Sequence, residues 1–391
     1  MIDARINVVE FCSTQASHCR GNRQKNSGTI PRFSQEIICM NTTELQFLKD
    51  LLHAPSPSGY ERPVQDVVRA YASRFTSDVR TDWHGNVIVA VNPLGFPRIM
   101  LAGHCDQIGL LVKHIDDKGF LWVHAIGGWD PQVLIGQDVQ VWTKNGPIAG
   151  VIARKPIHLQ SPEDRKVVPE IKSLWVDIAV KDGEEARGLV AIGDPITVQL
   201  GYRELRNGLA AAPGMDNKVG AWTVISAAER ISRQNPTAAV FAVSTVQEEI
   251  GLRGVQTSAH QIDPQLGIVV DVTHATDCPT IDENQYGRIK LGRGPVLYRG
   301  PNVNPIVFDR LVSKAAALEM PIQVNGLATA ASNDAAQLQL TRGGVATGLV
   351  CIPNRYMHSP VEIVSLEDVN AAAELIAQFC LSVDAHSDFT P

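Results

Sequence analysis

From residue 45 to 106, and again after residue 220, segments with helical spacing of apolar residues alternate with short apolar runs. Helical spacing predicts helices at Leu45–Leu52, 64–71, 220–231, 303–318 and 365–383. Short apolar runs predict buried strands at residues 85–91, 98–106, 238–246 and 267–273. Because helices alternate with buried strands, these parts of the chain predict an α/β layered fold.

A different pattern covers residues 110–205. Short segments of alternating polar and apolar residues surround turns such as Asp116–Gly119 and Lys144–Gly146, and helical periodicity is almost absent. We therefore predict an all-β insertion at residues 110–205, which splits an α/β domain formed by residues 40–109 and 206–391.

The first 39 residues lack sustained periodicity, and they also lack the long apolar segment of a secretory signal. Asn41 and Glu44 have the spacing of a capping box, which predicts that the first helix begins there. We expect residues 1–39 to be a disordered extension or the product of a mis-assigned start codon; a targeting segment is an alternative.

Composition and charge indicate which binding partners and which cellular compartment to expect. The 391 residues carry a formal net charge of −6, which gives no electrostatic reason to expect binding to nucleic acid or to an anionic membrane. No apolar run approaches the roughly 20 residues that a transmembrane helix needs. Seven dispersed cysteines without CxxC spacing indicate reduced thiols, so we expect a cytoplasmic protein.

Candidate metal ligands lie at the ends of the predicted elements. His104 and Asp106 end the strand 98–106, and their spacing places both side chains on one face. A metal-binding histidine commonly donates its second ring proton to a carboxylate, and Asp106 is positioned to accept it. Taken alone, the pair is more often an ordinary polar strand end.

Five further acidic or histidine residues occupy similar places, namely Asp216, Glu248, Glu249, Asp271 and His358. Each is unremarkable alone, as a helix cap, a turn acid or an exposed histidine. Together they meet where open α/β sheets bind ligands, and they suit divalent cations. A two-metal site needs a bridging carboxylate and a base, so one of the adjacent glutamates can bind metal while the other accepts a proton.

Five motifs, in this order, resemble those of the M42 metallo-aminopeptidases, also called TET aminopeptidases. The resemblance covers about residues 41–385 and rests on GHCDQIG, PGMDNKVG, VQEEIGLRG, VVDVTHATDCP and RYMHSPVE. One departure is Ser332-Asn333-Asp334-Ala335, where many members carry Gly-Thr-Asp-Ala. Because this segment is expected near the substrate pocket, the specificity stays open.

The resemblance implies a role for each candidate residue. It implies two divalent metal ions per subunit, zinc or cobalt with manganese as an alternative, bound by His104 and Asp271 on one ion, Glu249 and His358 on the other, and Asp216 on both. It further implies that Glu248 is the general base, that Asp106 orients His104, and that the Asp216–Asn217 peptide is cis.

The resemblance also implies a fold and an assembly. We expect an α/β/α exopeptidase domain with a mixed sheet, interrupted by a small β-barrel-like insertion that mediates dimerisation. Six dimers would form a homo-oligomeric dodecamer, and the substrates would be short peptides. Two alternatives stay open, namely an endo-1,4-beta-glucanase-like glycoside hydrolase and a non-catalytic metal-binding assembly protein.

Overall fold

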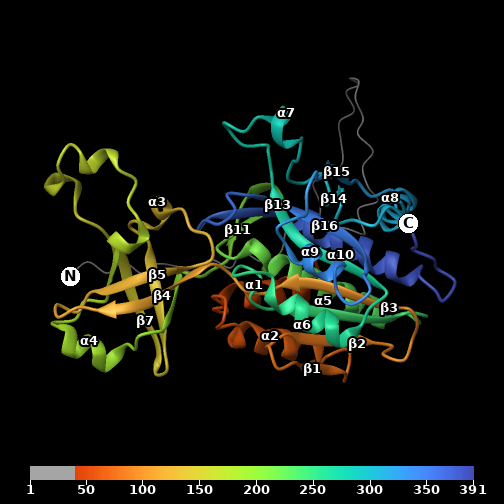
Figure 1. Cartoon of the computed structure of the whole chain (residues 1–391), viewed down its shortest axis with the longest axis horizontal. Helices are drawn as coiled ribbons and strands as arrows, with labels where there is room; N and C mark the ends of the chain where they lie inside the picture. Colours follow the sequence, from red (N-terminus) through yellow and green to blue (C-terminus); the bar gives the residue numbers. More distant parts are fainter. Residues whose placement is uncertain (1–39) are drawn as a thin grey trace, which may run out of the picture. The chain divides into compact units, whose positions relative to one another are not determined.

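The computed structural model describes residues 40–391 (Figure 1). The predictions for residues 1–39 lie outside these described residues. The predicted capping box is present, because Asn41 accepts hydrogen bonds from the amides of Thr43 and Glu44 and the Glu44 side chain accepts one from the amide of Asn41. Among residues 40–391, no helix is long and apolar enough to cross a membrane.

An 11-stranded sheet organises the α/β part of the described chain, with the main strand order β1-β2-β12-β3-β13-β16-β17-β11-β10 and with β14 and β15 joined beside β16. Its strands are β1 (Val79–Thr81), β2 (Val87–Val91), β3 (Arg98–His104), β10 (Arg203–Glu204), β11 (Leu209–Ala212), β12 (Ala239–Thr245), β13 (Leu266–His274), β14 (Val296–Arg299), β15 (Gln323–Gly326), β16 (Ala346–Arg355) and β17 (Glu362–Ser365). The sheet is mixed, as predicted, because its central strands β12, β3, β13 and β16 are parallel whereas β1, β2, β17 and β11 pair in antiparallel fashion.

Helices surround this sheet (Figure 1). They are α1 (Thr42–His53), α2 (Arg62–Ala72), α5 (Met215–Ser232), α6 (Arg253–Ile262), α7 (Glu283–Tyr286), α8 (Pro305–Ala317), α9 (Asp334–Gln339) and α10 (Leu366–Leu381). Every residue of β12 is buried, as is all of β13 except its last residue. Strands that are buried at successive positions need cover on both faces, so the α/β/α layering is confirmed.

Helix α5 is buried along nearly its whole length, because it lies between β3, β12 and β13 on one side and α1 and α10 on the other. Its side chains from Val219 to Ala228 are all apolar or small, which suits such an interior position. Its largest side chain, Trp222, is fully buried, and the indole N–H donates to the carbonyl of Glu44 at 2.9 Å. This bond joins α5 to α1, whereas the contacts of α5 with β3, β12 and β13 hold it against the central strands, where the candidate site lies.

The predicted insertion contains a closed barrel with the strand order β4-β5-β8-β7-β6-β9. Its strands are β4 (Gly109–Ile115), β5 (Leu121–Ile126), β6 (Asp138–Thr143), β7 (Gly146–Ala153), β8 (Trp175–Asp177) and β9 (Pro195–Val198). The two predicted turns join β4 to β5 and β6 to β7. The insertion is not purely β, however, since it also contains α3 (Pro131–Leu134) and α4 (Gly183–Leu189), the latter capped by Asp182.

Candidate metal centre

Parallel strands bring the first candidate residues to one edge of the sheet. His104 ends β3 and is paired in register with Thr245 of β12, so the Glu248–Glu249 pair that follows β12 emerges beside it. The neighbouring ladder between β3 and β13 ends at the pair Ala102 and Val269, two residues before His104 and Asp271. Because β3 and β13 stop pairing at this point, there is room between them for side chains.

The start of α5 lies in this space between the ends of β3 and β13. Asp216 and Asn217 have non-helical backbone angles, and the peptide between them is cis, which confirms the expectation. The Asn217 side chain donates to the carbonyl of Val270 on β13 at 2.8 Å and accepts from the amide of Gly220 at 3.0 Å. These two bonds hold the turn against β13, and the Asp216 carboxylate therefore lies beside Asp271.

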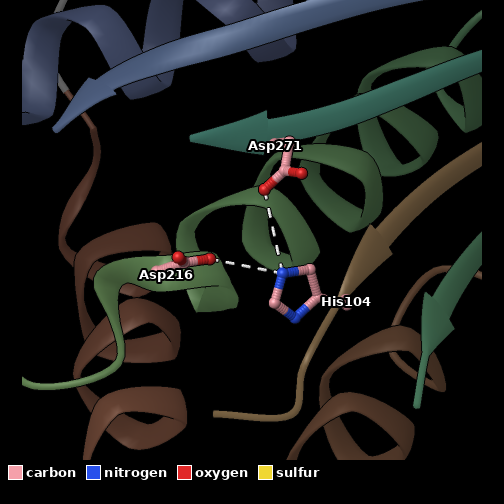
Figure 2. A group of neighbouring side chains, drawn as sticks. All are labelled: His104, Asp216 and Asp271. Carbon is pink, nitrogen blue, oxygen red and sulfur yellow. Dashed lines mark ion pairs between the residues drawn. The ribbon is translucent and has the colours of Figure 1, made fainter. Parts of the chain in front are cut away.

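One group of possible metal ligands consists of His104, Asp216 and Asp271, which approach one another from three different elements (Figure 2). The His104 Nε2 atom lies 3.3 Å from Asp216 Oδ1 and 3.7 Å from Asp271 Oδ1. All three side chains are almost completely buried. Although burial disfavours a charged imidazole, the carboxylates of Glu248, Asp106, Asp216 and Asp271 raise the pKa of His104.

A second group consists of Asp216, Glu249 and His358. The His358 Nε2 atom lies 3.3 Å from Asp216 Oδ2 and 3.3 Å from Glu249 Oε2. Asp216 and Glu249 together raise the pKa of His358 to about 11, which shows how strongly positive charge is favoured here. Asp216 therefore faces each histidine with a different carboxylate oxygen.

The chemistry of the donors fits divalent cations. The Nδ1 atom of His358 lies 2.8 Å from the carbonyl of Gly128, and that of His104 lies 3.1 Å from the carbonyl of Asp106. Since a carbonyl can only accept, each ring donates through Nδ1, and when a cation takes the place of the Nε2 proton, the Nε2 lone pair faces the carboxylates. Glu249 Oε1 is also buried and has no hydrogen-bond partner. Lone pairs that face one another in this way are satisfied by a cation between them.

Glu248 lies beside these two groups without belonging to either. Its Oε2 atom is 3.8 Å from His104 Nε2, and the residue is buried. Burial raises the pKa of Glu248 well above its ordinary value, and burial followed by Asp216 raises the pKa of Glu249 to about 7. A raised pKa means that the carboxylate holds a proton more readily than an exposed glutamate does, which suits a group that accepts a proton.

Asp106 has a wider set of contacts than the sequence predicts. Its Oδ1 is 3.5 Å from His104 Nδ1, which is longer than the 3.1 Å between that nitrogen and the Asp106 carbonyl. Its carboxylate instead accepts from the amides of Glu248 at 3.0 Å and Glu249 at 3.2 Å, and from the Ser58 hydroxyl at 2.6 Å. That the Asp106 carboxylate orients His104 stays a prediction. In the structure this carboxylate accepts hydrogen bonds from the backbone amides of the two adjacent glutamates.

Glu362 on β17 is a residue that the sequence analysis missed. Its Oε2 accepts from the amide of Asp216 at 2.8 Å and its Oε1 accepts from the amide of His358 at 2.9 Å. One buried carboxylate thus connects the backbones of two candidate ligands. The only signal was its place within the RYMHSPVE motif, four residues after His358.

Glu61 and Ser58, in the loop that precedes α2, were missed as well. The Glu61 carboxylate accepts from the amides of Gly59 at 2.6 Å and Gln247 at 3.2 Å, so it holds the backbone next to Glu248. Burial and then the nearby Asp106 raise the pKa of Glu61 to about 7. A Pro/Ser/Gly loop has no periodicity that could have indicated these contacts.

A cavity of about 740 Å³ opens over the two groups. Its lining includes the six residues predicted to bind metal or to act as the base, namely His104, Asp216, Glu248, Glu249, Asp271 and His358. Ser332 and Asn333, the first two residues of the segment that departs from the family pattern, also line it, as expected for the substrate pocket. The arrangement can therefore bring a small molecule to the candidate ligands.

The chain is similar in sequence and in fold to known aminopeptidases. A model of the family described as M42 glutamyl aminopeptidase matches residues 85–375. The lysyl aminopeptidase of Pyrococcus furiosus is 35% identical over 351 residues, which cover 88% of this chain and 99% of that protein. Among solved structures, a TET aminopeptidase from a marine sediment archaeon of the Thaumarchaeota is 32% identical with a TM-score of 0.84, covering 88% of this chain and 97% of its own.

Two other solved structures bear on assembly and on chemistry. The TET1 peptidase of Pyrococcus horikoshii, which can assemble into a tetrahedron or a large octahedral shell, is 28% identical with a TM-score of 0.77 over 87% of this chain and 100% of its own. A Thermotoga maritima protein named endoglucanase is 27% identical with a TM-score of 0.69 over 85% and 96% of the two chains. The family match and the 35% identical relative lead to one conclusion: the chain belongs to the M42 glutamyl aminopeptidase family, and it is a peptidase.

Proposed function

We propose that the protein is an aminopeptidase that removes residues from the free N-terminus of short peptides, with two divalent cations per subunit and Glu248 as general base. The observation that carries this proposal is the position of Asp216. Its two carboxylate oxygens each lie 3.3 Å from a different histidine, and each histidine belongs to a separate group of possible ligands. A carboxylate shared in this way is what a two-metal hydrolytic site requires.

The residues that would hold the cations follow from the two groups. His104 and Asp271 would hold one ion, Glu249 and His358 the other, and Asp216 would contact both. Imidazole and carboxylate donors without a thiolate suit zinc, cobalt or manganese. When bound, such ions polarise a peptide carbonyl and lower the pKa of water.

Glu248 would carry the proton. Its carboxylate accepts a proton from the attacking water and then donates it to the leaving amine of the peptide. The Asp106 carboxylate keeps Glu248 in place, because it accepts a hydrogen bond from the Glu248 amide at 3.0 Å. In this proposal the two adjacent glutamates have different roles: Glu249 is a metal ligand and Glu248 is the general base.

We also propose the domain roles and the assembly predicted from the sequence. Residues 40–109 and 206–391 would form the catalytic domain, and residues 110–205 would mediate dimerisation, with dimers forming a dodecamer. The solved P. horikoshii relative, which assembles into closed shells, supports a homo-oligomer. Four apolar side chains between β7 and β8 are more than half exposed, which suits an interface: Ile157, Leu159, Val167 and Val168.

Peptide hydrolysis before and after metal removal tests the activity. The purified chain is incubated with a peptide that has a free N-terminus and with its N-acetylated form, and the products are identified by mass spectrometry. We expect stepwise loss of N-terminal residues from the free peptide alone, abolished by a chelator and restored by zinc, cobalt or manganese. Internal cleavage, or activity that survives complete metal removal, would contradict the proposal.

A soluble β-1,4-glucan in the same assay tests the glycosidase alternative. The structural relative named endoglucanase shares the fold with relatives named aminopeptidases, so the fold does not separate the two chemistries. We expect no release of reducing sugar. If the chain bound metal but cleaved neither peptide nor glucan, the non-catalytic alternative would replace the proposal.

A further inference from the structure

We infer that this aminopeptidase prefers substrates whose N-terminal residue has a neutral side chain, rather than a lysine or a glutamate. The inference rests on the proposed function and concerns the part of the cavity beyond the candidate metal ligands. That cavity, of about 740 Å³, must hold the N-terminal residue of the peptide next to Glu248.

Among residues 40–391, the lining beyond the six candidate metal-binding and base residues carries no aspartate, glutamate, lysine or arginine, and its one further titratable side chain is that of the exposed His274. Its walls are formed instead by small, apolar or amide side chains, among them Leu252, Ala330, Ala331, Ala336, Gln337 and Met357. Leu252, Ala331, Ala336 and Met357 are themselves partly buried, so a substrate side chain that enters here exchanges water for apolar contact.

Two charged side chains that adjoin these walls are already paired or buried, whereas Arg253, which follows Leu252, is exposed and does not line the cavity. Arg355, which precedes Met357 by two residues, forms hydrogen bonds of 2.8 and 2.7 Å with the Asp277 carboxylate. Asp334, which follows the lining residue Asn333, is buried outside the lining and accepts a hydrogen bond from Thr245 at 2.7 Å. Neither is placed to neutralise a charged substrate side chain in the cavity.

Selectivity follows from the cost of moving charge out of water. A lysine or glutamate side chain that enters a cavity without a counter-charge loses its hydration and gains no ion pair in exchange. A leucine, methionine or alanine side chain has no such cost and gains favourable apolar burial. The names of the P. furiosus relative, a lysyl aminopeptidase, and of the family, glutamyl aminopeptidase, therefore do not predict the substrate of this chain.

A panel of aminoacyl-p-nitroanilides tests the inference with the full-length, metal-loaded protein. The panel contains the leucyl, methionyl, alanyl, lysyl and glutamyl derivatives, and kcat/KM is measured for each. We expect at least one neutral derivative to exceed both charged ones by ~10-fold or more, since an uncompensated charge costs more than about 1.4 kcal/mol.

A variant that adds a charge to the cavity wall tests the same inference. Ala336 lies in the first turn of α9, where an acid is tolerated, so Ala336→Asp places a carboxylate in the cavity wall. We expect kcat/KM for the lysyl derivative to rise relative to the leucyl one, whereas the matched variant Ala336→Asn leaves that ratio unchanged.

The outcomes separate this inference from the proposed function. A wild-type preference for the lysyl or glutamyl derivative would overturn the inference and leave the aminopeptidase activity standing. Failure to cleave any derivative, together with failure to shorten free peptides, would overturn the proposed function and the inference with it.

Discussion

Two buried carboxylates hold the backbone of the candidate metal centre. Asp106 accepts from the amides of Glu248 and Glu249, and Glu362 accepts from the amides of Asp216 and His358. Each uses both of its carboxylate oxygens. Four of the six residues assigned to the metals and the base therefore have their backbone amides held by one of these two carboxylates.

The sequence indicated the histidines and acids that could bind metal. It did not indicate Glu362, which connects two of them through their backbone amides. Histidines and acids at strand ends are visible because they interrupt apolar runs. Glu362 lies 146 residues from Asp216 along the chain, and only the pairing of β17 with β11 and β16 brings it close. Such a contact depends on the register of a mixed sheet, which no local pattern contains.

Replacing Glu362 by glutamine tests this positioning role. Glutamine keeps the shape but offers one carbonyl oxygen, and its NH₂ group faces an amide that needs an acceptor. We expect the affinity for zinc, measured by competition with a chelating dye, to fall about 10- to 100-fold while the fold is retained.

Asp368→Asn is the matched control for this substitution. Asp368 is also buried and accepts from two backbone amides, those of Gly292 and Gly294, but it lines no part of the metal-site cavity. We expect it to lower the melting temperature without changing the affinity for zinc. Equal losses of zinc affinity in both variants would show that Glu362 has only a general structural role.

At the scale of elements, long apolar patterns predicted the fold well and short segments were missed. The predicted strands at 238–246 and 267–273 correspond to β12 and β13, and the last predicted helix corresponds to α10. The sequence patterns led us to no prediction for the 10-residue helix α6, nor for α9 and β15, which are only six and four residues long. Segments of this length carry too few positions for periodicity to show, and tertiary packing decides their conformation.

Helix α5 begins at the candidate site, and replacing its buried Trp222 tests how the helix is packed. We expect Trp222→Ala to lower the free energy of unfolding by about 3–5 kcal/mol, because it leaves a cavity between α5 and α1 and removes the bond to the Glu44 carbonyl. Urea denaturation of the metal-free protein measures the change. The fully exposed Trp83 is the control, and Trp83→Ala should change stability by no more than ~0.5 kcal/mol. Similar effects of both substitutions would contradict the packing described for α5.

At the scale of the whole molecule, the proposal joins a buried metal centre to an assembly that limits access. A closed shell would admit short peptides and exclude folded proteins, which agrees with a cavity sized for a peptide end. The exposed apolar side chains between β7 and β8 are the proposed contact, since their burial in an interface would remove apolar surface from water.

Light scattering tests the assembly. We expect the wild-type protein to have a mass well above that of one chain, and Ile157→Asp combined with Leu159→Asp to give a smaller species. Both residues are exposed in the single chain, so their replacement should leave its melting temperature nearly unchanged. A wild-type protein that stays monomeric at every concentration would contradict the proposed assembly.

The most direct test of the central claim is the turnover of Glu248→Gln at a measured metal content. Glu248 lies outside both groups of possible ligands, so its replacement removes the base and leaves the cation donors in place. We predict two bound ions per chain, as in the wild type, with peptide turnover reduced by about 10²- to 10⁴-fold. Near-normal turnover with both ions bound would contradict the assignment of Glu248 as the base and, with it, the proposed division of work between the adjacent glutamates.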